Sequence, residues 1–312
     1  MFDTVNFKLT AADVEGVSFI EETPCYLADV GTHQYSNGEI VITGKLAGLS
    51  VTASSWQVKV KDGSLCKWYL GDNFKSMGRG DVQRAVERLS DELHLPMNLA
   101  TVTRLDVACN FITQYPTEVY INHLGVLAYA KRLLQPSGLY YQKRDERLCF
   151  YDKNREQRAR GEPLPDLYRD RNVLRYEQRY THRLASVLGV PAVTGATLYD
   201  ERFYIAVLNR WRDTYNAIRK INDIQLNFQA MKTKQQLYRQ GVLSLIERAG
   251  GEVEFIAQIA EAQKRGELTA KQAHDLRQAV KQACQEREGL TVKSEAIDEL
   301  NKKIAEAVRF YR

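Results

Sequence analysis

Two pairs of an arginine and an acid stand out as residues that could do chemistry, and each pair lies on a stretch that is typical of a β-strand. One pair is Arg104 and Asp106, and the other is Arg175 and Glu177. Alternate residues of a strand point to the same face of a sheet, so both members of a pair share a face. Carboxylate oxygens are ligands that Mg²⁺ and Mn²⁺ prefer. Asp106 and Glu177 are therefore candidate ligands of one such ion.

A predicted hairpin adds a phenol to this set. If residues 144–147 form a symmetric turn, Tyr140 faces Tyr151 on a polar face, and Lys153 falls on the same face. Tyr141 then points to the opposite, apolar face, where we expect it to join the core. A three-residue loop or a bulge would exchange the two faces.

Two acids, a lysine, arginines and a tyrosine on one sheet face indicate metal-assisted cleavage of a phosphodiester. The cation would polarise the phosphate and align it for in-line attack by the nucleophile. Free tyrosine has a pKa of about 10, and a nearby cation such as Lys153 would favour the phenolate. Attack by Tyr140 would form a phosphotyrosine link and release a 3′-OH. The structural alternative is that the acids are salt-bridged, that the tyrosine fits a half-buried strand, and that Lys153 pairs with Asp145 or Glu146.

The composition places the chain among ordinary globular proteins. It has 312 residues, of which 44% are hydrophobic and 27% are charged. No apolar run approaches the roughly 18 residues that a membrane span needs, and the first residues do not resemble a secretory signal. Five cysteines without a C-x-x-C spacing are typical of small apolar side chains in a reducing compartment. We therefore expect a cytoplasmic protein without a membrane partner.

The charge distribution favours nucleic acid as a partner. Residues 143–183 hold twelve Lys or Arg against eight Asp or Glu, a surplus of four in a chain whose net charge is +5. Most of these cations are arginines, whose planar fork suits phosphate oxygens. A solvated surface of mixed charge is the alternative. The five histidines are scattered and include no His-x-His pair, so any metal must rely on carboxylates.

The elements that must position these residues divide the chain into two regions. Residues 1–190 favour strands with a few helices, and residues 191–312 favour helices. We therefore expect an α+β domain with a mostly antiparallel sheet and flanking helices, followed by an all-helical region. Within the first region the patterns predict helices at 81–95 and 117–134, strands at 101–111 and 172–181, a strand through 65–70 after a turn at Asp62-Gly63, and a polar loop at 155–171.

Five short motifs occur in an order that resembles a known family. They are MFDTVNFKL, GSLCKWYLGDNF, TRLDVACNF, YYQKRDERLCFYDKNRE and VLRYEQRY. The series resembles the phage and plasmid replication initiators of the filamentous-phage gene II/X type. It is also similar to the carboxylate-based Rep_trans initiators of small plasmids. The resemblance covers roughly residues 1–190.

The resemblance implies an origin-specific nicking and closing enzyme for rolling-circle DNA replication, with Mg²⁺ or Mn²⁺ as cofactor. The enzyme would stay attached to the 5′ end through a tyrosine. The free 3′-OH would prime a host polymerase, and a host helicase would be recruited. By position in the motifs, Asp106 and Glu177 match the acidic residues, and residues 151–153 match the Tyr-Asp-Lys element that contains Lys153.

The nucleophile is assigned by the same resemblance. Tyr140 best matches the tyrosine of the plasmid type, which a glycine and a serine-arginine pair usually follow, whereas here Tyr141, Gln142 and Lys143 follow. The phage type places its tyrosine after the Tyr-Asp-Lys element, where this chain offers Tyr168. We rank Tyr140 first, Tyr168 second and Tyr141 third.

The predicted DNA contacts are basic or aromatic side chains. Lys67 is expected to contact the DNA backbone, and Trp68 or Tyr69 is expected to stack on a base. Strand parity would put Lys67 and Tyr69 on one face and Trp68 on the other. The full set predicted to contact DNA is Lys67, Tyr69, Arg104, Lys143, Arg144, Arg147, Arg175 and Arg179.

Residues 191–312 carry helical apolar stripes, and their role stays open. They could bind the origin duplex, form a homodimer or contact host replication proteins. For the whole chain two alternatives to the enzyme stay open as well. One is a non-catalytic regulator that binds the same DNA, like the shortened gene X-type product. The other is an unrelated DNA-binding regulator built on the helices.

Overall fold

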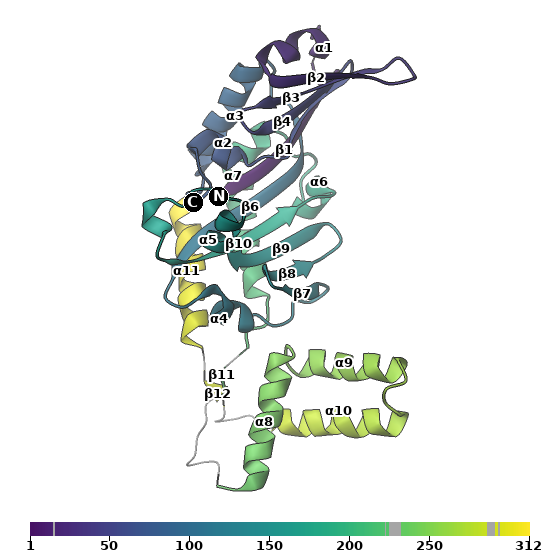
Figure 1. Cartoon of the computed structure of the whole chain (residues 1–312), viewed down its shortest axis with the longest axis vertical. Helices are drawn as coiled ribbons and strands as arrows, with labels where there is room; N and C mark the ends of the chain where they lie inside the picture. The colour runs from purple at the N-terminus through teal and green to yellow at the C-terminus, as the bar shows by residue number, and fades with distance from the viewer. Residues whose placement is uncertain (15, 222, 225–231, 286–290, 293) are drawn as a thin grey trace.

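One large antiparallel sheet forms the centre of the protein, which we describe from a computed structural model (Figure 1). The structure describes all residues except 15, 222, 225–231, 286–290 and 293. Ten strands follow one another in the order β2-β3-β4-β5-β1-β6-β10-β9-β8-β7. They are β1 (Phe2–Thr10), β2 (Ala28–Gln34), β3 (Ile40–Leu46), β4 (Leu49–Ser54), β5 (Gln57–Lys61), β6 (Thr101–Thr113), β7 (Lys131–Gln135), β8 (Gly138–Gln142), β9 (Glu146–Asp152) and β10 (Asn172–Tyr180).

Helices flank this sheet and continue as a helical C-terminal region. They are α1 (Phe19–Glu22), α2 (Leu65–Leu70), α3 (Arg79–Leu93), α4 (Thr117–Asn122), α5 (Lys153–Ala159), α6 (Leu184–Leu188), α7 (Glu201–Asn216), α8 (Lys234–Arg248), α9 (Glu252–Lys264), α10 (Ala270–Gln285) and α11 (Glu295–Tyr311). Short 3₁₀ turns are η1 (Thr23–Tyr26), η2 (Asp166–Tyr168) and η3 (Ala196–Tyr199), and a small ribbon pairs β11 (Asp223–Ile224) with β12 (Thr291–Val292). The predicted α+β class with a helical C-terminal region is confirmed.

The strands β6 and β10 lie side by side and show the alternation that the sequence predicts. Arg179 of β10 lies opposite Asp106 of β6. On the other face, the Tyr176 ring stacks on Trp211 of α7 with 4.6 Å between ring centroids, and the Tyr176 hydroxyl donates a hydrogen bond to the Trp211 carbonyl. Helix α7 thus covers the apolar face of β6 and β10, and the opposite, polar face is the one that can hold a functional site.

The hairpin β8–β9 pairs two residues away from the predicted register. Tyr140 lies opposite Cys149, and the two-residue tip is Arg144-Asp145, because the Lys143 amide donates to the Glu146 carbonyl at 3.0 Å. The turn predicted at residues 144–147 is therefore wrong. A shift of two residues leaves each side chain on the same face of the sheet, so Tyr140 and Tyr141 keep the faces predicted for them.

The helix predicted at 117–134 is wrong in its second half. Helix α4 ends at Asn122, and residues 131–135 form the edge strand β7, which pairs with β8. Between them, Gly125 approaches the backbone so closely that an added Cβ would lie 2.9 Å from the Arg219 carbonyl oxygen. Pairing with β8 has overridden the helical pattern of the segment.

The strand predicted through residues 65–70 is wrong as well, because these residues form helix α2. The Ser64 side chain accepts a hydrogen bond from the Lys67 amide, which caps the first turn, and Gly71 ends the helix with a φ of 88°. The turn at Asp62-Gly63 therefore leads into a helix instead of a second strand. In a helix, residues two apart do not share a face, so Lys67 and Tyr69 diverge.

The helical region after residue 190 divides between two apolar cores. Buried side chains of α7 and α11 belong to the same core as the sheet, whereas α8, α9 and α10 surround a second, smaller core. In Figure 1 helix α11 runs back along the sheet domain, and α8–α10 stand apart from it. Among the described residues, no helix combines the length and the apolar character needed to cross a membrane.

Candidate active site

Two carboxyl groups meet on the polar face of β6 and β10. Asp106 and Glu177 are 0% and 3% exposed. Their side chains hydrogen-bond to each other, and each carboxyl group influences the ionisation of the other. The strand alternation that the sequence shows therefore brings both acids into one buried cluster.

Three arginines surround this carboxyl pair. The Arg104 guanidinium binds both oxygens of Asp106, at 2.9 and 2.6 Å. Arg179 Nε donates to Glu177 Oε1 at 2.8 Å, and Arg175 Nε lies 3.4 Å from Glu177 Oε2. Arg175 is 2% exposed, whereas the Arg104 and Arg179 side chains are each 30% exposed. The carboxyl pair is thus covered by two guanidinium groups that reach the surface.

The two acids have pKa values that move in opposite directions. Burial, together with the Glu177 charge, raises the pKa of Asp106 to about 7, although Arg104 opposes the shift. Burial also works against ionisation of Glu177, but Arg175 and Arg179 outweigh it and lower the pKa of Glu177 to about 2. Glu177 is therefore an anion near neutral pH, and Asp106 is the carboxyl group of the pair that takes up a proton more readily, which is the behaviour of two carboxyl groups forced together.

Tyr151 of β9 adds a phenol to the carboxyl pair. Its hydroxyl donates a hydrogen bond to Glu177 Oε2 at 3.0 Å. Burial, followed by the Glu177 charge, raises the pKa of the Tyr151 phenol well above its usual value. The Arg175 charge acts in the opposite direction. The sequence placed Tyr151 on the polar face but did not rank it as a nucleophile; the Tyr-Asp-Lys element that begins at Tyr151 was the available signal.

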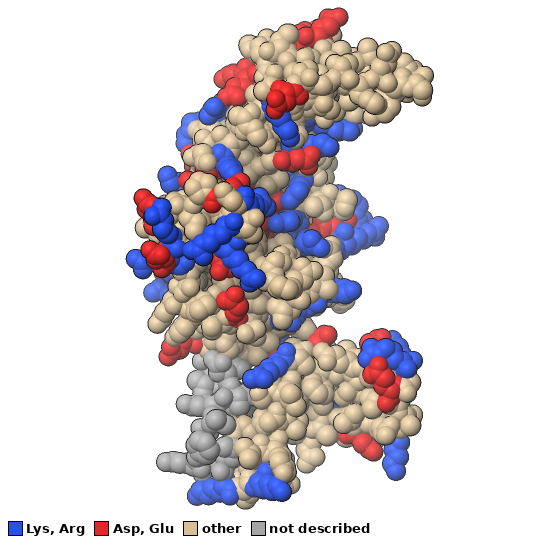
Figure 2. Space-filling view, in the orientation of Figure 1, with Lys and Arg blue, Asp and Glu red and all other residues tan. Residues whose placement is uncertain are grey.

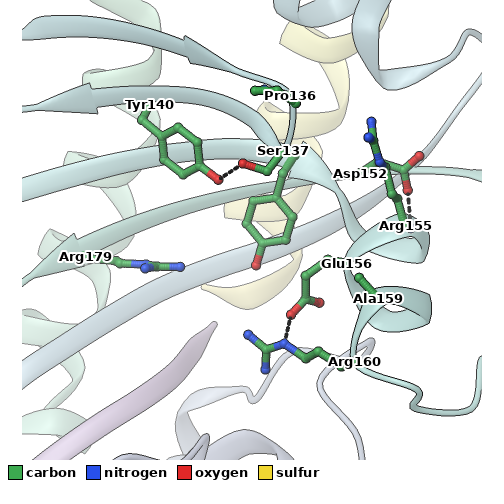
Figure 3. A pocket seen from close by; sticks show the side chains of 10 residues that line it. Pro136, Ser137, Tyr140, Asp152, Arg155, Glu156, Ala159, Arg160 and Arg179 are labelled. Atoms are coloured by element: carbon green, nitrogen blue, oxygen red, sulfur yellow. Dashed lines mark hydrogen bonds and ion pairs between the residues drawn. The ribbon is translucent and has the colours of Figure 1, made fainter.

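A pocket of about 470 Å³ opens beside this phenol (Figure 3). One wall is the β7–β8 turn and β8, where the Tyr140 hydroxyl lies 3.0 Å from Ser137 Oγ. The other wall is helix α5, and Arg179 points toward the pocket from the sheet. The lining residues are Pro136, Ser137, Tyr140, Tyr151, Asp152, Arg155, Glu156, Ala159, Arg160 and Arg179. Two phenols and three arginines therefore share one pocket, which we call the tyrosine pocket.

The other candidate catalytic residues lie outside the tyrosine pocket. The strand ends at Asp152, so Lys153 begins helix α5; its ammonium group binds Glu156 at 2.8 Å and lies over the Phe74 ring. Tyr168 packs on Phe74 with 4.7 Å between ring centroids. Tyr141 is buried on the apolar face, as predicted, and its hydroxyl donates to the Gly125 carbonyl at 2.6 Å.

The residues predicted to contact DNA fall into several groups. Arg104, Arg175 and Arg179 contact the carboxyl pair, and the Arg147 guanidinium lies 5.6 Å from the centre of the Tyr140 ring. The remaining four lie elsewhere, with Lys143 and exposed Arg144 at the hairpin tip and Lys67 and Tyr69 on α2.

Further cations follow the tyrosine pocket along the surface. Arg155 and Arg158 of α5 and Arg160, which follows α5, are exposed. Figure 2 shows Lys and Arg side chains gathered on the middle of the visible face, where Figure 1 places α5.

Asp3 of β1 is a member of the cluster that the sequence did not point to. Its carboxylate forms an ion pair with the Arg175 guanidinium, which also donates to the Asn73 carbonyl at 3.2 Å and to Asn110 Oδ1 at 3.1 Å. These three partners come from three separate segments of the chain, all distant in sequence from Arg175. Local patterns carry no signal for such contacts, which depend on the order of strands in the sheet.

The carboxyl pair fits a divalent cation in the type of its ligands. Mg²⁺ binds through one or two carboxylates together with substrate phosphates and water, and Asp106 and Glu177 supply two such groups. Among the described residues no group of three or more His, Cys, Asp or Glu side chains is arranged to hold a metal. A cation at this pair would therefore need oxygens from a phosphate, and the Arg104 and Arg179 guanidinium groups would have to turn outward.

Comparison with known proteins agrees with this reading of the sheet domain. No curated protein matches the chain. A family model that describes the N-terminal part of the phage replication-associated protein of gene II matches residues 1–202, which include every strand of the large sheet and the whole polar face. The chain therefore belongs to this family of phage replication initiators of the gene II type.

Proposed function

We propose that the protein starts rolling-circle replication by cutting one strand of its origin with a tyrosine of the tyrosine pocket. The cut would leave a 5′-phosphotyrosine link and a free 3′-OH. The observation that carries the proposal is the contact between the Tyr151 hydroxyl and Glu177, within the carboxyl pair that Asp106 completes. Membership of a replication initiator family supports the same reading.

Tyr151 is the nucleophile that the contacts favour over Tyr140. The Tyr151 hydroxyl touches a carboxylate, whereas the Tyr140 hydroxyl is paired with Ser137 at the rim. In the reaction, the phenol oxygen forms a bond to phosphorus, the bond from phosphorus to the 3′ oxygen breaks, and the phenol proton passes to the carboxyl pair. The carboxyl pair then gives this proton to the 3′ oxygen, so protons and charge balance over the step. Tyr140 would then contact the bases beside the cut.

The arginines would hold the strand during this exchange. Arg155, Arg160 and Arg179 line the pocket, and a guanidinium group binds a phosphate through two parallel hydrogen bonds. Asp106 and Glu177 would hold Mg²⁺ or Mn²⁺, which supplies polarisation of the phosphate when it is bound. The free 3′-OH would serve a host polymerase, and a host helicase would separate the strands. The role of the helices α8–α10, including any part in a homodimer, stays a prediction.

A plasmid-relaxation experiment tests the proposal. The protein is incubated with supercoiled DNA that carries its origin, with Mg²⁺, with Mn²⁺ or with EDTA. We expect nicking and a covalent protein–DNA adduct only with the metal. Tyr151→Phe should abolish the adduct and keep DNA binding, whereas Tyr140→Phe and Tyr168→Phe should keep the adduct. An adduct that survives Tyr151→Phe and disappears in Tyr140→Phe would refute our choice of nucleophile.

A non-catalytic regulator is the second candidate, and one observation favours it. The carboxyl pair is already neutralised by Arg104 and Arg179, so the cluster is complete as a structural ion-pair network. Such a protein would bind the origin and leave it intact with either metal. Binding without nicking under every condition would therefore support the regulator.

A further inference from the structure

A second polar pocket lies beside the start of α5 and shares Arg160 with the tyrosine pocket. It has a volume of about 420 Å³ and is formed by α2, the start of α5, the segment that follows α5, and the turns at residues 47–48 and 62–64. Its charged lining residues are three cations, Lys67, Lys153 and Arg160, and two acids, Asp62 and Glu162. We call it the Lys67 pocket. Three cations around a small hollow form a place for an anion.

An acid of the protein occupies this place. Glu162, which follows α5, accepts a hydrogen bond from Lys67 Nζ at 2.6 Å and another from Gln157 Nε2 at 2.6 Å. The bond from Lys67 lowers the pKa of Glu162 below its usual value, so its carboxylate is an anion at neutral pH. The Lys67 and Glu162 side chains are 44% and 29% exposed, so water and other anions can reach the pair.

The Lys67 pocket is joined to the carboxyl pair by a chain of contacts. Ser64 lines the pocket and donates a hydrogen bond to Asp3. Asp3 forms an ion pair with Arg175, which contacts Glu177 in turn. Arg160 lines both the Lys67 pocket and the tyrosine pocket. The two pockets are therefore neighbours that share one arginine.

We propose that the Lys67 pocket binds a phosphate group of the DNA strand near the cut. In the free protein the Glu162 carboxylate occupies this phosphate site, and the strand displaces it. The inference rests on the proposed function only in taking a DNA strand as the ligand. A partly exposed ion pair such as Lys67 and Glu162 contributes little stability, so a phosphate that also meets Arg160 displaces the carboxylate at low cost. Glu162 thus weakens DNA binding and prevents anions that bind less tightly than DNA from entering the pocket.

The test measures affinity for a fluorescent single-stranded oligonucleotide that spans the origin, in EDTA so that no cutting is needed. Glu162→Gln should bind the oligonucleotide about two- to fivefold more tightly, because Lys67 is released for a phosphate. Lys67→Ala should bind more weakly and reduce the salt slope, by about 0.7 for one lost phosphate contact. In the Lys67→Ala background, Glu162→Gln should give little further gain, because the ammonium group that binds Glu162 is already removed.

Asp166→Asn is the matched control. Asp166 lies in the same segment, pairs with Arg169 at 2.7 Å and has a side chain that is 90% exposed. Its replacement removes the same charge without touching the Lys67 pocket. Equal gains in Glu162→Gln and Asp166→Asn would overturn the proposal, since net charge alone would then explain the effect.

A second readout identifies the ligand as a phosphate of the strand. Oligonucleotides with one uncharged methylphosphonate linkage are scanned through the binding site. A single linkage position should cancel the gain of Glu162→Gln. The proposal fails if no position cancels it, or if inorganic phosphate at matched ionic strength binds the variant more tightly while the oligonucleotide does not. Loss of nicking activity leaves these binding results unaffected, so the two proposals fail independently.

Discussion

Arg175 is the residue whose removal should disturb the site most, and Arg175→Met makes the prediction quantitative. Its guanidinium is buried, pairs with Asp3 and Glu177, and donates to the Asn73 carbonyl and to Asn110. Methionine fills much of the same space but leaves both acids without this cation. Breaking a buried ion pair from one side costs about 3–5 kcal/mol. At about 2–4 °C per kcal/mol, the melting temperature should fall by about 10 °C.

Urea denaturation of both proteins at several pH values is the assay. Arg175 is one of the cations that lower the pKa of Glu177 from 4.5 to about 2. A lowered carboxyl pKa stabilises the folded state above the unfolded pKa, and this contribution disappears as the pH falls toward the folded pKa. The stability difference between wild type and Arg175→Met should therefore be full at pH 7 and become smaller below pH 4.5.

Arg169→Met is the control, because the Arg169 side chain is 63% exposed and its pair with Asp166 is a surface pair. This change should cost at most about 1 kcal/mol. If Arg175→Met costs no more than the control, or if its cost does not depend on pH, the buried network does not stabilise the protein as we argue.

Two further predictions concern neighbouring residues. The pKa of Asp106 is raised from 3.8 to about 7 in the folded state. At pH values between these two, the folded protein keeps a proton on Asp106 that the unfolded chain releases. The stability of the wild type should therefore fall as the pH rises from 5 to 8. In Asp106→Asn this fall should be smaller in urea denaturation and nicking should be lost; parallel pH curves for the two proteins would contradict the assignment. Tyr141→Phe removes the hydrogen bond to the Gly125 carbonyl and should cost about 1–2 kcal/mol in unfolding free energy. The nicking rate per folded molecule should stay unchanged in this variant, and a loss of nicking without a loss of stability would show that Tyr141 takes part in the reaction.

The parts of the fold that the sequence predicts are those that depend on local alternation. The faces of β6 and β10 follow from every second residue, so the meeting of Asp106 and Glu177 could be foreseen. The β8–β9 register could not be foreseen, because the charged tip allows turns at several positions. The register differs from the predicted one by two residues, which left Tyr140 and Tyr141 on their predicted faces. Where tertiary pairing competes with local preference, as in the edge strand β7, the sequence pattern is misleading.

The parts of the site that the sequence did not predict come from short caps and distant contacts. The Ser64 cap and Gly71 mark helix α2, yet the aromatic run between them is typical of a strand. Asp152 caps α5 in the same way, which turns Lys153 away from the strand. The ion pair between Asp3 and Arg175 joins residues 172 positions apart, and only the order of strands in the sheet brings them together.

The measurement that tests the central claim most directly is the identity of the tyrosine that becomes linked to DNA. Trypsin separates the candidates, because the peptide 148–153 contains Tyr151, the peptide 133–143 contains Tyr140 and Tyr141, and the peptide 161–169 contains Tyr168. After nicking in the presence of Mg²⁺ or Mn²⁺ and nuclease digestion, mass spectrometry should find a nucleotide on the peptide 148–153. A nucleotide on either of the other two peptides would contradict the site built around Tyr151, Glu177 and Asp106.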